Sequence, residues 1–446
     1  MAKVGLPSGT RDFLPEQLIF RQKVIGIMKE VFERYGFLPL ETPAVERLDV
    51  LSGKYGEEAD RLMFKVLKRG EELKSALAKG EELADMGLRY DLTVPLCRVI
   101  AMHQNDIDFP FRRYQIQPVW RADKPQKGRY REFYQCDVDV VGQEAPLPDA
   151  ELVAMTYEVL TALGFSNFSI RVNHRQILSA LADWAGISKE KQPGFFSALD
   201  KLDKIGLDGV KKELEDRGLA ADPIKKFLPV IEANSLDFLK QSLVSVEKGK
   251  NAVRETETLL QFTKHLGVPA SVVAYDVSLA RGLDYYTGPI FETVLSDANI
   301  GSITGGGRYD NLIQAFTGHR TPATGTSFGL ERIIDVLAER GKLEEAVSVT
   351  QVVILPFDEV SLGYGLEVAA FLRKERVRTE VYPFPEDKMR DKFGWVSKGK
   401  IAFAAVVGPD EMAERQVSFK NMATGQQVKL PFGQLPAELK NLLREE

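Results

Sequence analysis

The chain has 446 residues, a mass of 49.9 kDa and a formal net charge of −5, so we expect about two to four domains rather than one. The acidic balance excludes a non-specific nucleic-acid coat but permits a local basic site. Two cysteines exclude a disulfide framework, and four scattered histidines have no zinc-ligand spacing. With no apolar signal core at the N-terminus and no apolar run near the roughly 18 residues that a bilayer requires, we expect a cytoplasmic protein without a membrane partner.

The first elements in chain order are a helix and a short edge strand. Residues 16–35 carry apolar side chains at helical spacing and end at Gly36. The strand that follows contains Pro39 and ends at Pro43, which favours a sheet edge. Residues 65–85 are charged and repetitive, and we expect a solvated loop or a surface helix there.

Residues 87–142 have a β pattern, and their second half predicts an antiparallel hairpin. Two strands, 112–121 and 131–141, flank a loop at 122–130 that contains proline and glycine. With a period of two, one face of the hairpin is apolar. The other face carries Arg113, Gln115, Gln117, Arg121, Arg131, Phe133, Gln135, Asp137 and Asp139. This polar face is either solvated or the floor of a polar ligand site.

The charge of this stretch bears on that choice. Residues 111–131 contain seven Arg or Lys and one Asp within an acidic protein. Arginine at a strand end suits phosphate, because its planar donors bind in pairs. An aromatic ring at Phe133 can stack on a base, and the basic loop with Arg129, Tyr130 and Arg131 can meet a polyanion. A solvent-exposed charged hairpin remains the alternative.

Two further segments carry candidate ligand-binding side chains. Residues 88–95 place Arg89, Asp91 and Thr93 on one expected strand face, where a solvated edge is the alternative. Residues 279–288 contain Arg281, which precedes a glycine and the tyrosine pair at 285 and 286. Arginine and tyrosine donors suit an anionic or amino-acid ligand, although the tyrosines also fit ordinary packing.

Two glycine-containing segments complete the pattern. Residues 305–310 are too glycine-rich for an ordinary strand and suggest close approach of the backbone to a ligand. They match neither the phosphate-binding loop nor the dinucleotide fingerprint. Residues 325–333 read as a strand that enters a helix through Gly329, with Arg332 in the first turn. A helix N-terminus with an added arginine is typical of a phosphate site.

The rest of the chain separates into regions of different pattern. A helix at 151–163, a strand at 168–172 and strands within 271–294 surround a helix-rich stretch. After a linker expected at 341–348, strands and helices alternate from residue 350, which predicts a separate α/β domain with a largely parallel sheet. We therefore expect a domain of two parts at 1–176 and 267–345, a helical insertion at 177–266 and a C-terminal domain at 350–446.

Taken in order, these segments resemble the histidyl-tRNA synthetase family of class II aminoacyl-tRNA synthetases. WRADKPQKGRYREFYQ is similar to class motif 2, GLERI to motif 3, and the first helix and strand to motif 1. RGLDYYTG and GGGRYD are similar to the histidine-specific signatures. The resemblance implies an α/β protein: an α+β catalytic domain with the class II antiparallel sheet flanked by helices, a helical insertion, and a C-terminal α/β anticodon-binding domain.

The resemblance also implies roles for individual residues. ATP would be bound by Arg121 at the α-phosphate, Phe133 at adenine and Arg332 at the γ-phosphate, with Arg281 as the catalytic cation. Histidine would be bound by Asp91, Thr93, Gln135, Asp139, Tyr285 and Tyr286. Lys127 and Arg129 are candidate tRNA contacts. Mg²⁺ would lie on the pyrophosphate side without a site made by protein ligands alone. The implied partners are L-histidine, ATP, tRNA(His) and a second copy in a homodimer.

Some residues depart from the common family pattern, and other functions remain open. Many bacterial members carry Glu at the positions of Asp91, Asp139 and Asp123. One alternative is a synthetase-like regulatory subunit of ATP phosphoribosyltransferase, which usually lacks the C-terminal domain and has eroded motifs. Another is a binding-only sensor of uncharged tRNA. Here the last 97 residues and the three implied arginines at 121, 281 and 332 are present, which favours the enzyme.

Overall fold

In the computed structural model, the described residues are 4–52, 61–126, 128–280, 285–298, 300–343 and 348–435. The chain divides into two compact units. One comprises Met1–Asp12 with Val24–Leu337, and the other Phe13–Lys23 with Ala338–Glu446. Among the described residues, no helix combines the length and apolar character that a membrane crossing needs.

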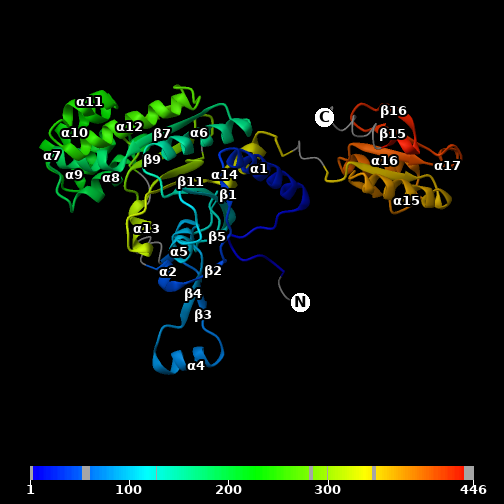
Figure 1. Cartoon of the computed structure of the whole chain (residues 1–446), viewed down its shortest axis with the longest axis horizontal. Coiled ribbons are helices and arrows are strands. Elements are labelled where there is room, and N and C mark those ends of the chain that lie inside the picture. The colour runs from blue at the N-terminus through cyan, green and yellow to red at the C-terminus, as the bar shows by residue number, and fades with distance from the viewer. Residues whose placement is uncertain are drawn as a thin grey trace. The chain divides into compact units, whose positions relative to one another are not determined.

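An eight-stranded sheet forms the centre of the first unit (Figure 1). In spatial order its strands are β1 (Leu38–Pro39), β5 (Phe111–Trp120), β6 (Glu132–Val141), β11 (Ala323–Phe328), β10 (Thr304–Arg308), β9 (Pro289–Leu295), β7 (Phe168–His174) and β8 (Val273–Tyr275). From β5 to β7 every pairing is antiparallel, and the outermost strands β1 and β8 pair in parallel with their neighbours. The expected antiparallel sheet is confirmed, as is the edge position of Pro39.

Helices cover this sheet and bury its apolar side chains. They are α1 (Pro15–Arg34), α5 (Thr93–His103), α6 (Leu147–Ala162), α13 (Asp310–Thr317) and α14 (Leu330–Glu339). The ring of Phe32 from α1 lies between those of Tyr114 and Phe328, at centroid distances of 5.6 Å to each. This contact joins α1 to both β5 and β11, on the sheet face opposite the polar face of the hairpin.

Helix α5 contradicts the β pattern that the sequence predicted across residues 87–142. Strand β4 (Ala84–Leu88) ends before the helix, so Asp91 and Thr93 do not share a strand face. Asp91 Oδ1 instead accepts the backbone N–H groups of Thr93 and Val94 at 3.1 Å each, which satisfies two donors of the first helical turn. Most of α5 is buried, so its sequence lacks the polar stripe that marks a surface helix.

A small three-stranded sheet, in the order β2-β4-β3, projects from the unit (Figure 1). It contains β2 (Val45–Arg47), β3 (Lys65–Leu67) and β4, with α2 (Leu48–Leu51) beside it and α4 (Gly70–Lys79) at its tip. The surface helix expected within residues 65–85 is confirmed as α4. The strands on either side of α4 were not expected, because the charged side chains of this segment obscure the two-residue alternation that marks a β-strand.

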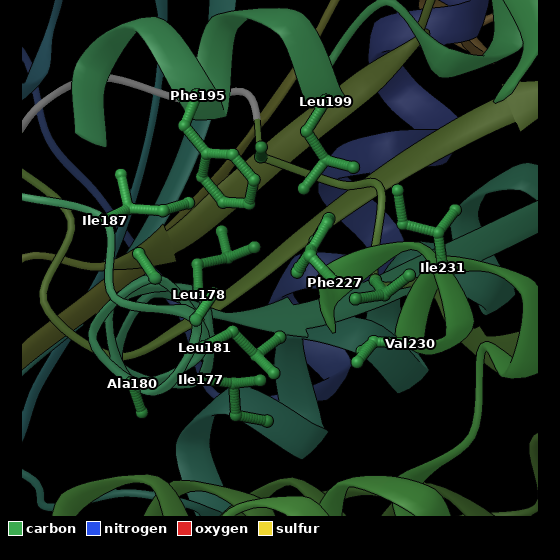
Figure 2. Packing of buried hydrophobic residues seen from close by; sticks show 14 of the residues in the cluster. Ile177, Leu178, Ala180, Leu181, Ile187, Phe195, Leu199, Phe227, Val230 and Ile231 are labelled. Carbon is green, nitrogen blue, oxygen red and sulfur yellow. The ribbon is translucent and has the colours of Figure 1, made fainter. Parts of the chain in front are cut away.

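Residues 175–265, all described, fold into six helices. These are α7 (Arg175–Ala185), α8 (Gln192–Leu199), α9 (Leu202–Asp216), α10 (Ala221–Ala233), α11 (Leu236–Ser242) and α12 (Glu247–His265). Their shared core contains Phe195 and Phe227, both labelled in Figure 2. The two rings meet edge to face, with centroids 4.6 Å apart. The helix-rich pattern of the sequence is confirmed, and the apolar faces of α7, α8 and α10 explain it.

The second unit contains a five-stranded sheet in the order β13-β12-β14-β15-β16. Its elements are β12 (Val352–Pro356), α15 (Glu359–Lys374), β13 (Thr379–Val381), α16 (Met389–Lys398), β14 (Phe403–Val407), α17 (Pro409–Glu414), β15 (Gln416–Asn421), β16 (Gln427–Pro431) and a 3-10 turn at Phe432–Gln434. The three parallel strands and two helices match the expected α/β alternation. The antiparallel strands β15 and β16 were not expected.

The glycines of β10 allow the centre of the large sheet to pack closely. A Cβ atom at Gly306 would lie 2.2 Å from the carbonyl oxygen of Gly325 and 2.5 Å from the ring of Phe291. A Cβ atom at neighbouring Gly305, which lines a cavity, would meet nothing within 4 Å. At Gly306, which also lines the cavity, strand packing by itself requires glycine.

We expect Gly306→Ala to lower the free energy of unfolding by about 1–3 kcal/mol, because the new methyl group overpacks the sheet. Gly305→Ala is the matched control and should change it by less than about 0.5 kcal/mol. Urea unfolding of the two variants measures the difference. Equal stability of both variants would contradict this account of β10.

Candidate active site

A cavity of about 690 Å³ opens over the polar face of the β5–β6 hairpin. Its walls come from the segment before α5, the strands β9, β10 and β11, and the first turn of α14. All the described side chains to which the resemblance assigned a role line this one cavity. They are Asp91, Thr93, Arg121, Arg129, Phe133, Gln135, Asp139, Tyr285, Tyr286 and Arg332. Arg281 and Lys127 lie outside the described residues.

The register of the hairpin builds the floor of the cavity. Arg113 lies opposite Asp139, and Gln115 lies opposite Asp137, so the four side chains share one face. All four are almost completely buried. The alternative of a solvent-exposed charged hairpin is therefore wrong for this part of the face. Asp137 and Asp139 line the cavity, whereas Arg113 and Gln115 are buried beside them without lining it.

Arg121 and Gln135 connect the two strands at the loop end of this floor. Arg121 Nη2 donates to Gln135 Oε1 at 3.0 Å, and Arg121 Nε donates to the carbonyl of Tyr90 at 3.0 Å. The guanidinium carbon of Arg121 lies 5.1 Å from the ring centroid of Phe133. Gln135 Nε2 donates onward to Asp137 Oδ1 at 3.2 Å. An arginine, an amide and an aromatic face are thus held in one place, which suits a phosphate beside a base.

A ring of tyrosines encloses the other end of the cavity. The rings of Tyr285 and Tyr286 meet edge to face at 5.0 Å, and Tyr285 lies 5.9 Å from Tyr309. The hydroxyl of Tyr285 is hydrogen-bonded to Thr93. Burial raises the pKa values of all three phenols, so they stay neutral and can donate hydrogen bonds at neutral pH.

Buried carboxylates give this end of the cavity a negative character. Asp91, Asp137 and Asp139 are each 3% exposed. Burial raises the pKa of Asp139 to about 6, while the charge of Arg113 opposes that shift. Burial also raises the pKa of Asp137, against the charge of Arg113 and a hydrogen bond from Ser327. Acidic side chains next to neutral phenols suit a ligand that carries N–H donors.

The first turn of α14 forms the wall near the hairpin loop. Arg332 Nη1 donates to the carbonyl of Ser302 at 2.5 Å. Its neighbour Glu331 accepts from Arg11 Nη2 at 2.5 Å and from the backbone N–H of Tyr134 at 3.2 Å. The guanidinium of Arg11 also lies 3.5 Å from the ring centroid of Tyr130. This chain of contacts holds the N-terminal segment, the hairpin and α14 together.

Four residues of the site region were not selected as site residues in the sequence. Arg11 and Glu331 are 320 positions apart, so no local pattern links them. Tyr309 donates its hydroxyl to Asp139 Oδ1. Arg113 pairs with Asp139 at 2.7 Å. The alternation of the hairpin had placed Arg113 on the correct face, and the glycine-rich signature contains Tyr309, but neither pattern indicated their partner.

Two further points bear on charged ligands. Arg129 lies 3.6 Å from Asp123 and has 58% of its side chain exposed, so it is accessible beside the cavity. Among the described ranges, no group of His, Cys, Asp or Glu side chains is arranged to hold a metal ion.

The antiparallel sheet, the arginine-bearing hairpin on it and the strand-to-helix wall with a second arginine define the catalytic domain of a class II aminoacyl-tRNA synthetase. Comparison with known proteins assigns the particular family. The family model for histidyl-tRNA synthetase matches residues 9–333, and the model for the anticodon-binding domain matches residues 351–442. The chain belongs to the histidyl-tRNA synthetase family.

Relatives match the chain over nearly its whole length. A histidine–tRNA ligase of Gloeobacter violaceus is 42% identical over 98% of this chain and 99% of its own length. One of Phocaeicola vulgatus is 43% identical over 96% of each chain. The crystal structure of histidyl-tRNA synthetase from Nostoc sp. PCC 7120 is similar with a TM-score of 0.86, 33% identity, and coverage of 99% of this chain and 100% of that one.

We expect Arg11→Met to lower the free energy of unfolding by about 1–3 kcal/mol, since it removes a hydrogen bond to a buried charged group. Glu331 is the affected partner, with 7% of its side chain exposed. Arg47→Met is the control, because the pair of Arg47 with Asp49 is exposed on both sides and should leave stability unchanged. Urea unfolding measures the free energy of unfolding of both variants. Equal decreases would contradict the stabilising role of the contact between Arg11 and Glu331.

Proposed function

We propose that this chain joins L-histidine to tRNA(His) in two steps. A carboxylate oxygen of histidine attacks the α-phosphorus of ATP, the bond to the β-phosphate oxygen breaks, and pyrophosphate leaves. A hydroxyl oxygen at the 3′ end of the tRNA then attacks the carbonyl carbon of the adenylate, the bond from that carbon to the phosphate oxygen breaks, and AMP leaves. The observation that carries this proposal is one cavity that combines the arginines, the aromatic ring and the buried carboxylates expected for both substrates.

The proposed ATP roles are those that the family resemblance implies, and the order of side chains along the hairpin supports them. Phe133 stacks on adenine, and Arg121 holds the α-phosphate within reach of Gln135, which contacts the reacting carboxylate. Arg332 contacts the γ-phosphate from the first turn of α14. In the family, Arg281 is the cation that stabilises the attacked α-phosphate, and we propose the same role for it here. These side chains act by positioning and by charge stabilisation.

The histidine roles fall to the acidic end of the cavity. Asp91 and Thr93 bind the α-ammonium group, since both lie at the start of α5 and line the cavity. Asp139 and Tyr286 bind the two imidazole nitrogens, with Tyr285 beside them. A site of buried polar groups rejects ligands that cannot pair with those groups, which gives selectivity for histidine.

Mg²⁺ fits this site as an ion held mainly by the triphosphate. Glu292 and Glu331 line the cavity, but both oxygens of Glu331 already accept hydrogen bonds. Both carboxylates are candidates to help hold the ion, because Mg²⁺ bound to nucleotides usually takes one or two protein carboxylates. When bound, the ion neutralises negative charge on the leaving pyrophosphate.

The tRNA contacts extend beyond the cavity. We assign Lys127 and Arg129 of the hairpin loop to the acceptor end, and the helical insertion at 177–266 to the acceptor arm. The anticodon-binding domain, residues 350–446, carries five Lys or Arg and one Asp within 388–400. Lys392 is buried, and the other four basic side chains are exposed, which suits an RNA-facing surface. We place the protein in the cytoplasm, where its tRNA substrate is found.

ATP–pyrophosphate exchange with each of the twenty amino acids tests the proposed reaction. We expect exchange with histidine alone, because only its ring offers the paired nitrogens that the acidic end requires. Arg121→Ala should abolish exchange, since it removes the proposed α-phosphate contact, and Arg47→Ala is a surface control. Folded protein that supports no exchange with any amino acid would contradict the proposal and favour the regulatory-subunit alternative.

We also propose a homodimer, formed through α1 and β1, which correspond to class motif 1. Light scattering at micromolar concentration should give twice the chain mass of 49.9 kDa. A monomer mass would contradict this assembly.

A further inference from the structure

Arg113 is a buried arginine below the cavity rather than a part of its wall. It lies on β5, has no exposed surface, and does not line the cavity. Its Nη2 atom is 2.7 Å from Asp139 Oδ2 and donates to the carbonyl of Leu92 at 3.4 Å. Its Nε and Nη1 atoms have no hydrogen-bond partner among the described residues. Burying a charge that is only partly hydrogen-bonded costs free energy, and the opposite charge that Arg113 faces offsets part of that cost.

Asp139 is the group that Arg113 faces, and it is held from two sides. Its Oδ1 atom accepts the hydroxyl of Tyr309. Its Oδ2 atom faces Arg113 as an ion pair without an aligned hydrogen bond, so it keeps acceptor capacity. Unlike Arg113, Asp139 does line the cavity. The carboxylate is therefore fixed in orientation while one acceptor site remains for a ligand.

The charges around Asp139 show what Arg113 contributes. The titratable and charged groups that act on Asp139, or on which it acts, come from several elements: Arg113, Asp137, Asp91, Tyr309, Tyr286 and Cys97. Two of these are further carboxylates, two are phenols and one is a thiol, and Arg113 supplies the positive charge. Without that charge, burial and like-charge repulsion would favour a protonated Asp139.

The protonation state of Asp139 decides which hydrogen bond it offers. An ionised carboxylate only accepts, whereas a protonated one also donates. A neutral imidazole has one N–H donor and one bare nitrogen. The ionised state of Asp139 accepts from the N–H, whereas the protonated state can donate to the bare nitrogen. An ionised carboxylate that is fixed in place therefore binds the N–H group of the imidazole ring.

We propose that Arg113 is a positioning residue for histidine recognition, which holds Asp139 as an ionised acceptor for an N–H of the substrate ring. The inference rests on the proposed function, because it deepens the role of Asp139 in that site. Arg113 itself touches no substrate.

The first test compares Arg113→Met, which keeps the apolar stem, with Arg113→Lys, which keeps the charge. ATP–pyrophosphate exchange gives KM for each substrate. We expect Arg113→Met to raise KM for histidine about 10- to 100-fold, the factor for loss of one hydrogen bond to a charged group, and to leave KM for ATP unchanged. Arg113→Lys should recover part of the loss. Equal increases in both KM values would overturn the proposal.

The pH dependence separates this role from a merely structural one. The kcat/KM for histidine reports the free protein and free substrate, and it should fall as pH drops through the pKa of Asp139, about 6, because protonation removes the acceptor. In Arg113→Met this fall should begin at higher pH, since the opposing positive charge is gone. The ring pKa of free histidine, about 6.5, is the same for both proteins, so a shift between them belongs to the protein. An unshifted profile would refute the proposal.

A double variant keeps the test valid if Arg113→Met unfolds. Removing both partners of a buried ion pair is tolerated better than removing one. In an Asp139→Asn background, Arg113→Met should cause no further rise in KM for histidine, whereas an additive rise would overturn the coupling. Failure of the wild-type protein to exchange with histidine would instead refute the proposed function.

Discussion

The antiparallel pairing of β5 with β6 is the constraint on which the site depends. Its register sets Arg113 against Asp139 and Gln115 against Asp137, so a shift by one residue would turn the polar row toward the apolar core. The next strand, β11, continues the same register, with Gly325 opposite Asp139 and Ser327 opposite Asp137. The hairpin therefore fixes both the polarity of the floor and the place of each side chain along it.

Burial makes this polar floor both costly and useful. Carboxylates at 3% exposure lose most of their hydration, so they require partners within the protein or a ligand. Ser327 and Gln135 donate hydrogen bonds to Asp137. Tyr309 donates one to Asp139, and Arg113 forms an ion pair with Asp139. Apart from Gln135, which lies on the same strand as Asp137, these partners come from other elements of the fold, which ties the folding of the sheet to the electrostatics of the site. An arrangement made this way is fixed before a ligand enters.

Local patterns in the sequence predicted the parts of the structure that depend on local geometry. The period of two placed the hairpin and its polar face, and the glycine before Arg332 placed the strand-to-helix turn. The helix α5 was missed because it is buried on most sides and shows no amphipathic stripe. The contact of Arg11 with Glu331 was beyond prediction, because it spans 320 positions. Alternation also cannot tell a solvated polar face from a buried one, since both have the same period.

The glycines near the site reveal a steric constraint that side-chain chemistry alone does not show, because a Cβ atom would not fit at two of them. A Cβ atom at Gly325 would lie 2.0 Å from Asp139 Oδ1, and one at Gly306 would strike the carbonyl of Gly325. The strand β11 must therefore carry glycine at this point, so that the carboxylate fits between Tyr309 and Arg113. The glycine at Gly306 on β10 has a separate cause, because its Cβ atom would also lie 2.5 Å from the ring of Phe291. The buried charge of Asp139 thus accounts for the glycine of β11, and strand packing accounts for Gly306.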